Sequence, residues 1–297
     1  MSKEKWLSEL GTPSVEIPKC ELTFVKCYKC ETFDIELYTQ PNGPDTVQRV
    51  MMVIPHNIKK PCPAVAVPFY CPEKMLGLNP ETGEKLERFV DVPLMIQLAE
   101  RGYITISADA YHLTYIHETP ENEDFSFWQI AAQKLRKDNP NWTGVGKLVS
   151  DTKLIIDALC EDERVDSERI GIAGHSLGGK MAFYTGCLDE RIKVIMASDF
   201  GFGWDQTNWN DIWYWGDYVD TLKAKNMDHS DLLSVAYPKP FCLIAGQYDN
   251  ADSFEMMCKA KGYSKGDERL KIINHQTGHR PPFYALSEAY DFLDKWL

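Results

Sequence analysis

A serine that stands between glycines is the first residue in this chain whose surroundings indicate chemistry. The stretch GIAGHSLGGKM covers residues 171–181 and places Ser176 between Gly174 and Gly178, directly after a short apolar run. A serine hydroxyl is a poor nucleophile at neutral pH, so it needs a neighbouring base and an exposed position. A sharp turn from a strand into a helix supplies that exposure and leaves no room for Cβ atoms on its neighbours, which accounts for the glycines. The pattern predicts a nucleophilic serine, and the backbone N–H of Leu177, at the start of the helix, could stabilise an oxyanion.

Strand-like and helix-like segments alternate along most of the chain and would hold this turn in place. Residues 20–37 and 46–54 flank a turn signal and predict an antiparallel start to the sheet. Alternating strands and helices are typical of a mostly parallel sheet that is covered on both faces, so we expect an α/β fold with residues 1–297 in one domain. Further strands are predicted at 64–70, 103–109, 169–174, 194–198, 241–246 and 270–274, and helices at 93–101, 148–159, 177–187 and 286–297.

Two segments, residues 111–146 and 200–239, are too long for plain connections and are rich in aromatic residues. Both follow predicted strands, and insertions at such places in an open α/β sheet overhang the ligand crevice. We therefore expect them to form the substrate cover. Packing of the insertion onto the body of the protein is the commoner role of a tryptophan cluster, and it is the interpretation we favour. The candidate substrate contacts are Tyr111, His112, Trp204 and Trp209.

The serine turn resembles the nucleophile elbow of the α/β-hydrolase fold. The stretches RVDSERIGIAGHSLGG, AGQYD and GHRPP are similar to those of the dienelactone hydrolase-like and acetyl xylan esterase-like branch of that superfamily, over roughly residues 63–297. The resemblance implies a cofactor-free serine esterase whose substrate is a short-acyl or carbohydrate-linked ester, such as an acetyl ester. Dienelactone hydrolases themselves use a cysteine nucleophile, and position 176 is serine, so the lactone activity does not carry over.

The resemblance also implies an acid and then a histidine, in that order, in loops after later strands. Asp249 matches the acid that follows the penultimate core strand, and Asp252 and Asp199 are the second choices. His279 matches the histidine before the closing helix, and His275 is the competing base. We expect the triad to consist of the serine, Asp249 and His279.

A second oxyanion donor is implied after the strand at residues 64–70. The backbone N–H of Tyr70 is the first candidate there and that of Phe69 the next, although no His-Gly sequence stands at this place. In the implied mechanism Ser176 attacks an ester carbonyl, and His279 passes the serine proton to the leaving alcohol before water releases the acyl group.

Composition narrows the possible partners. The chain of 297 residues has 44 acidic and 32 basic residues and a net charge of −12, without a basic stripe, so we expect no nucleic-acid partner. It shows neither a leader-like start nor an apolar stretch of about 18 residues, so we expect a cytoplasmic protein without membrane contact. The nine cysteines are scattered and odd in number, which predicts reduced thiols. Cys27 and Cys30 form an isolated CxxC, and we expect no metal there.

Several further function classes fit the sequence less well. A peptidase or amidase would use the same triad, but the prolyl-peptidase relatives usually carry a propeller domain for which this chain has no room. A halide-removing enzyme would need aspartate at position 176. A non-catalytic binding protein of this fold would have lost triad positions, whereas all three residue types are present here. The sequence therefore favours a serine esterase and leaves the oligomeric state open.

Overall fold

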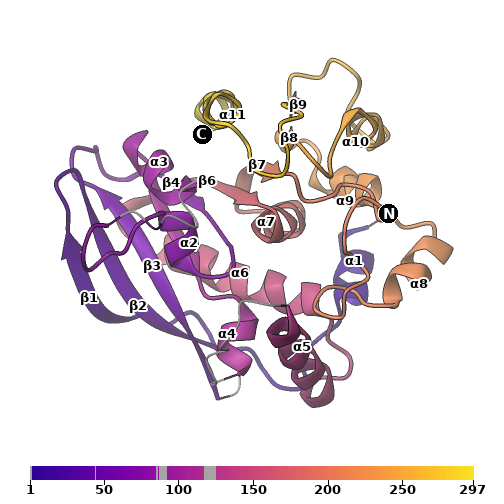
Figure 1. Cartoon of the computed structure of the whole chain (residues 1–297), viewed down its shortest axis with the longest axis horizontal. Helices are drawn as coiled ribbons and strands as arrows, with labels where there is room; N and C mark the ends of the chain where they lie inside the picture. Colours follow the sequence, from indigo (N-terminus) through magenta and orange to yellow (C-terminus); the bar gives the residue numbers. More distant parts are fainter. Residues whose placement is uncertain (1, 44, 85, 87–91, 117–124) are drawn as a thin grey trace.

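Nine strands form one sheet that runs through the described part of the chain (Figure 1). The computed structural model describes residues 2–43, 45–84, 86, 92–116 and 125–297. The strand order is β1-β2-β3-β5-β4-β6-β7-β8-β9. The strands are β1 (Thr23–Lys29), β2 (Phe33–Gly43), β3 (Thr46–Pro55), β4 (Cys62–Ala66), β5 (Ile104–Ala108), β6 (Val165–His175), β7 (Ile192–Ser198), β8 (Phe241–Ala245) and β9 (Leu270–Asn274).

The first three strands are antiparallel, as the sequence predicts, and β3 also pairs antiparallel with β5. All other pairings, from β5 through β4 to β9, are parallel. The expected mostly parallel α/β sheet is therefore confirmed. One detail differs, because residues 20–37 form most of a hairpin rather than one strand. The turn between β1 and β2 contains Cys30, Glu31 and Thr32, and this short polar sequence lacks the glycine, proline or asparagine that marks most turns.

Helices cover both faces of the sheet. Figure 1 shows α3 and α11 on one side of the parallel strands and α6 and α7 on the other. All residues of β5 and β8 are buried, as expected for strands enclosed by helices on both faces. The helices in the described residues are α1 (Lys3–Leu10), α2 (Pro72–Leu76), α3 (Leu94–Glu100), α4 (Tyr111–Tyr115), α5 (Ser126–Asp138), α6 (Gly144–Glu161), α7 (Leu177–Leu188), α8 (Tyr218–Ala224), α9 (His229–Ala236), α10 (Ala251–Met257) and α11 (Phe283–Trp296).

The parallel strands β6 and β7 end side by side. Their register pairs His175 with Ser198, the last residue of each strand. Ser176 and Asp199 are the next residues along the chain, so both lie at the carboxyl edge of the sheet. This is the edge at which open α/β sheets place their ligand sites.

The two long insertions contact one another. The first contains α4 and α5, with residues 117–124 outside the described part, and the second contains α8 and α9. The rings of Phe125 and Trp213 stack with centroids 5.8 Å apart, and the hydroxyl of Tyr111 donates a hydrogen bond of 3.1 Å to the carbonyl of Trp213. The insertions therefore pack together in the described structure, although they are far apart in the sequence.

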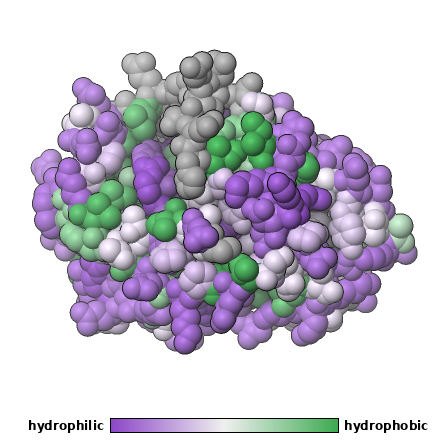
Figure 2. Space-filling model, turned by 90° about the horizontal axis from the view of Figure 1, so that it is seen from below, coloured by the Kyte–Doolittle hydropathy of each residue, from purple (hydrophilic) through white to green (hydrophobic). Residues whose placement is uncertain are grey.

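The surface fits the acidic, polar composition. Figure 2 shows a face on which hydrophilic residues predominate and hydrophobic residues gather in small groups. None of the described helices is both long enough and apolar enough to cross a membrane. All nine cysteines are free thiols, and the described residues contain no cluster of three or more potential metal ligands. The cytoplasmic location stays a prediction.

Candidate active site

Ser176 occupies a strained turn between β6 and α7. Its backbone angles are φ 56° and ψ −117°, which is unusual for a residue with a Cβ atom. The surroundings hold this conformation, since the N–H of Ser176 donates to the carbonyl of Ser198 at 2.8 Å and its own carbonyl accepts from the N–H of Lys180 at 3.1 Å. The residue is only partly buried. The turn therefore presents a serine at the carboxyl edge of the sheet, as the sequence pattern predicts.

The glycines around the serine allow very close backbone approaches. A Cβ atom on Gly174 would lie 2.1 Å from the carbonyl oxygen of Gly178, and one on Gly178 would lie 2.1 Å from that of Pro68. Both distances are far below van der Waals contact. Neither position accepts a larger residue, and the segment after β4 lies directly against the serine turn.

His279 lies in the loop between β9 and α11, and its ring is fixed by an acid. The Nδ1 atom is 2.6 Å from Oδ2 of Asp199, and the side chain of His279 is 29% exposed. With Nδ1–H donating to the carboxylate, Nε2 is left to exchange protons. The ring of Tyr248 packs edge-on against the histidine, with centroids 5.0 Å apart.

Backbone N–H groups surround the Asp199 carboxylate. The N–H groups of Gly246, Gln247, Tyr248 and Asp249 donate to it at 2.8–3.1 Å. Burial alone would raise the pKa of the Asp199 carboxyl, but the hydrogen bonds from His279 and from the backbone outweigh burial and lower that pKa. Asp199 is therefore held as an anion beside His279.

The expected acid, Asp249, does not meet His279 in the structure. Its carboxylate is fully buried and accepts hydrogen bonds from the N–H groups of Phe200, Gly201 and Phe202 at 2.6–2.9 Å. The hydroxyl of Ser253 donates to it at 2.9 Å. The expected Asp249–His279 pair is therefore not formed, and His279 is paired with Asp199, one of the two second choices.

The physical reason lies in the two loops. Asp199 follows β7 directly and has a φ of 44°, and the loop after β8 wraps its N–H groups around this carboxylate. That wrapping turns Asp249, four residues beyond β8, back toward the loop after β7. The useful signal in the sequence is a carboxylate directly after a parallel strand, because such a residue lies at the functional edge.

Asp252 and His275, the remaining candidates for acid and base, have other surroundings. Asp252 is an exposed residue in the first turn of α10. His275 is buried, and its Nδ1 lies 2.7 Å from the hydroxyl of Thr277. Of the two candidate bases, only His279 has a hydrogen bond to a carboxylate within the described residues.

The candidate oxyanion donors flank the serine turn. Leu177 is the first residue of α7, so its N–H has no acceptor within the helix. Tyr70 lies two residues after Pro68, whose carbonyl approaches Gly178, and the ring of Phe69 also lies against that glycine. A 3.0 Å hydrogen bond from the N–H of Ala110 to the carbonyl of Tyr70 joins this segment to the residues that follow β5. The roles of Leu177 and Tyr70 as oxyanion donors stay predictions.

Trp204 and Trp209 belong to the core, which corrects their candidacy as substrate contacts. Trp209 is completely buried and donates its indole N–H to the carbonyl of Gly201 at 2.7 Å. Trp204 donates to the carbonyl of Met227 at 2.9 Å, and both rings pack on His229. With their N–H groups satisfied internally, they anchor the second insertion, which is the packing role favoured from the sequence.

Tyr111 and His112 are also interior residues. Tyr111 is completely buried. The ring of His112 stacks on Trp128 with centroids 3.7 Å apart and meets the ring of Tyr70 edge-on at 6.0 Å. Burial lowers the pKa of His112 to about 3, so the ring is neutral. The structure therefore indicates a packing role for Tyr111, and it shows His112 packed against the ring of Tyr70.

Lys180 is a residue that the sequence analysis missed. It lies one turn after Ser176 on α7, is almost completely buried, and donates from Nζ to the carbonyl of Phe200 at 3.0 Å. The faces of Trp209 and Tyr214 lie 4.6 and 4.9 Å from the same nitrogen. Burial lowers its pKa to about 7. The signal in the sequence was a lysine inside the otherwise apolar run that follows the serine turn.

Solved structures share this arrangement of strands and helices. A glucuronoyl esterase from Solibacter usitatus superposes with a TM-score of 0.72 at 15% identity, covering 98% of this chain and 90% of that one. The chain has the α/β-hydrolase fold. A structure described as a "putative acetyl xylan esterase" from Bacteroides fragilis gives a TM-score of 0.71 at 18% identity, over 92% of this chain and 73% of that one.

Sequence comparisons agree with the fold. The family model described as "Glucuronyl esterase, fungi" matches residues 150–210, the part that contains both Ser176 and Asp199. A protein of Bacillus subtilis described as "Putative hydrolase YtaP" is 25% identical over 220 residues, which are 68% of this chain and 67% of that protein. The resemblance to the α/β-hydrolase superfamily is thus confirmed at the level of the fold.

Proposed function

We propose that this protein is a serine esterase that hydrolyses carboxylic esters linked to carbohydrates. One observation carries the proposal: the 2.6 Å contact between His279 and Asp199 lies at the sheet edge that also holds the strained Ser176. The serine and the aspartate follow the neighbouring strands β6 and β7, each one residue past the paired His175 and Ser198. This arrangement supports the proposed roles of Ser176 as nucleophile, His279 as base and Asp199 as acid in acyl transfer.

The proposed reaction has two halves. His279 takes the proton of Ser176 through Nε2 while the serine oxygen attacks the ester carbonyl. The backbone N–H groups of Leu177 and Tyr70 stabilise the tetrahedral oxyanion. His279 then protonates the leaving alcohol, and the acyl group stays on the serine. Water attacks this acyl-enzyme by the same steps in reverse order and releases the carboxylic acid.

Asp199 has a supporting role in this mechanism. Its carboxylate holds His279 in the tautomer that leaves Nε2 free, and its negative charge stabilises the imidazolium that forms when the serine loses its proton. It does not itself take up the proton. The backbone donors around Asp199 support this role, because they keep the carboxylate ionised.

The substrate class is proposed from the relatives. Their names describe glucuronoyl esterases and acetyl xylan esterases, in which the sugar supplies the acyl group or the alcohol, respectively. The two insertions, residues 111–146 and 200–239, are proposed to form the cover over the sugar within a single domain. Their mutual contacts through Trp213 support this part of the proposal.

A panel of esters tests the proposal. Wild type and Ser176→Ala would be assayed on 4-nitrophenyl acetate, acetylated xylose oligomers and methyl glucuronate, with 4-nitroacetanilide as the amide counterpart. We expect turnover of at least one sugar ester and a loss on the order of 10⁴-fold or more in kcat/KM in the alanine variant, with unchanged folding by circular dichroism. An alanine variant as active as wild type would refute the serine mechanism, and turnover of the amide alone would refute the ester.

A further inference from the structure

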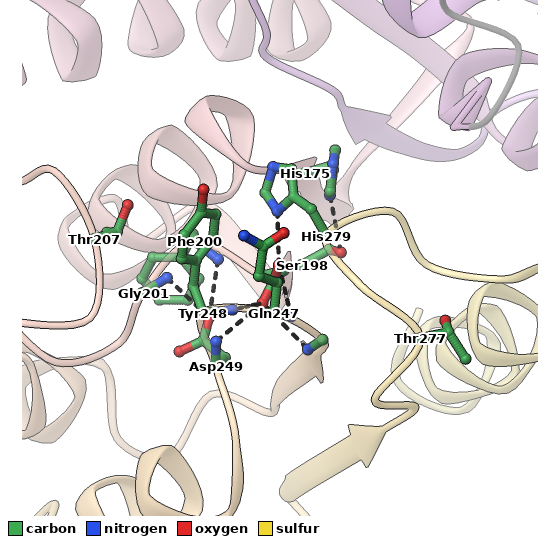
Figure 3. Close-up of polar contacts among 12 residues, drawn as sticks. His175, Ser198, Phe200, Gly201, Thr207, Gln247, Tyr248, Asp249, Thr277 and His279 are labelled. Atoms are coloured by element: carbon green, nitrogen blue, oxygen red, sulfur yellow. Dashed lines mark hydrogen bonds and ion pairs between the residues drawn. The ribbon is translucent and has the colours of Figure 1, made fainter.

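His175 is a buried histidine that the proposed mechanism does not use. It is the last residue of β6, directly before the nucleophile, and its side chain is enclosed by the protein. Its Nδ1 atom lies 3.1 Å from the hydroxyl oxygen of Ser198, its register partner on β7 (Figure 3). Ser198 also accepts the backbone N–H of Ser176 through its carbonyl at 2.8 Å. One residue thus contacts both the nucleophile's backbone and the imidazole of His175.

The ring of His175 packs against the ring of His279. Their centroids are 4.6 Å apart and the planes are inclined by 40°. Tyr248 meets the same histidine edge-on, with centroids 5.0 Å apart, while Asp199 holds its Nδ1. Three neighbours therefore restrict His279, and each comes from a different element: His175 from β6, Asp199 from the end of β7, and Tyr248 from the loop after β8.

Charge makes a neutral His175 necessary. The titratable and charged groups that act on it are His279, Asp199, Arg280 and His275. Burial first, and then the positive potential of His279, lower the pKa of His175 to about 3, so its ring is uncharged at neutral pH. When His279 becomes cationic during acyl transfer, it therefore meets a polarisable aromatic face and not a second positive charge.

We propose that His175, held by the hydroxyl of Ser198, is a positioning residue that orients His279 for proton transfer. The proposal rests on the proposed function and goes beyond the triad. The ring of His175 contacts the ring of His279, and the proposed role of His175 requires no contact with the reacting atoms. Ser198 sets its orientation. A small displacement of a catalytic base lowers the rate of the chemical step far more than it weakens substrate binding.

Three variants separate the ring contact from the hydrogen bond. His175→Asn removes the ring, His175→Phe keeps a ring without the hydrogen bond, and Ser198→Ala removes only the hydroxyl. On the best ester of the panel we expect kcat to fall about 10-fold in His175→Asn and about 3-fold in the other two, with KM within about 2-fold of wild type. Loss confined to KM, or an unchanged kcat in all three, would overturn the proposal.

A matched control guards against a general packing effect. Ser107 is a completely buried serine in β5 whose hydroxyl has no hydrogen-bond partner in the described structure. Ser107→Ala therefore also removes a buried hydroxyl from a strand, and we expect its kcat to match wild type. If Ser107→Ala lowers kcat as much as Ser198→Ala, the hydroxyl of Ser198 has no specific role and the proposal fails.

A double-mutant cycle tests whether His175 acts through the base. In the Asp199→Asn background the orientation of His279 is already lost. The fold-decrease in kcat caused by His175→Asn should therefore be less than half as large there as in the wild-type background. Losses that multiply in full would show that His175 acts independently of the His279–Asp199 pair, against the proposal. Ser176→Ala in the same assay keeps the two proposals apart: serine-independent turnover contradicts the esterase mechanism, whereas serine-dependent turnover with unaffected His175 variants contradicts only the positioning role.

Discussion

The loops after β7 and after β8 each carry one buried aspartate, and the two carboxylates differ in what they face. Asp199 and Asp249 both accept several backbone N–H groups from the opposite loop. Only Asp199 also meets a histidine. The aspartate of each loop thus accepts hydrogen bonds from the backbone of the other loop, and these bonds hold the two loops together.

The electrostatic outcome differs between the two sites. Hydrogen bonds from His279 and the backbone lower the pKa of Asp199 in spite of its burial. Burial raises the pKa of Asp249, although backbone groups oppose this, and the neighbouring Asp199 adds to the rise. Similar cradles therefore hold one acid suited to support a base and one suited to hold a loop. Both acids have hydrogen bonds from the backbone, so the contact with His279 is the reason for proposing Asp199 as the catalytic acid.

Of the changes that distinguish the two loops, Asp199→Asn is expected to have the largest effect. The amide keeps the size of the side chain. If its NH2 group faces His279 it favours the wrong tautomer, and if its oxygen does, the negative charge that stabilises the imidazolium is still missing. We expect kcat to fall on the order of 10⁴-fold with little change in KM, measured by steady-state kinetics on the best ester. A variant that keeps a tenth of the wild-type activity would remove Asp199 from the triad.

Asp249→Asn is the matched change in the other loop, and its expected effect is on stability. An amide NH2 would face the N–H groups of Phe200, Gly201 or Phe202, which would leave buried donors unpaired. We expect the free energy of unfolding in urea to fall by about 1–3 kcal/mol. Activity should fall less than about 10-fold at a temperature where the variant is folded. If kcat falls as far as in Asp199→Asn, the acid role returns to Asp249.

The sequence was sufficient for most of the sheet and for the serine turn. The apolar run at residues 241–246 contains the buried parallel strand β8, because a strand covered on both faces needs no polar face. The run at residues 270–274 forms β9, the parallel strand at the edge of the sheet, which is only partly buried. Ser176 was predictable because its glycines are required by local backbone contacts. His279 was predictable as the candidate base because the chain order of the superfamily places it before the last helix.

The choice between Asp199 and Asp249 was not predictable in the same way. Both follow strands, and what separates them is the left-handed backbone at Asp199 and the path of a loop 50 residues away. The tryptophans of the second insertion posed a similar difficulty, because composition does not tell an indole that faces a ligand from one that packs in the core. Such features depend on contacts between distant segments and leave no local pattern.

The smallest expected effect concerns the pH dependence of folding stability, to which Asp199 and Asp249 should contribute with opposite signs. Folding lowers the pKa of Asp199, so the unfolded chain binds this proton more tightly, and the stability that Asp199 contributes is lost as the pH falls below its unfolded value of about 3.9. Folding raises the pKa of Asp249, so its contribution is greatest at low pH and declines as the pH rises from about 3.9 through the folded value.

The two asparagine variants, which do not titrate at these positions, reveal this sign. Urea unfolding between about pH 3 and pH 7 would be measured for wild type and both variants, with the free energy of unfolding compared at each pH. The deficit of Asp199→Asn relative to wild type should shrink toward the acid end, and that of Asp249→Asn should shrink toward neutral pH. Deficits that follow the same trend would mean that folding shifts the pKa of both carboxyls in the same direction, and the electrostatic distinction between the two loops would then be wrong.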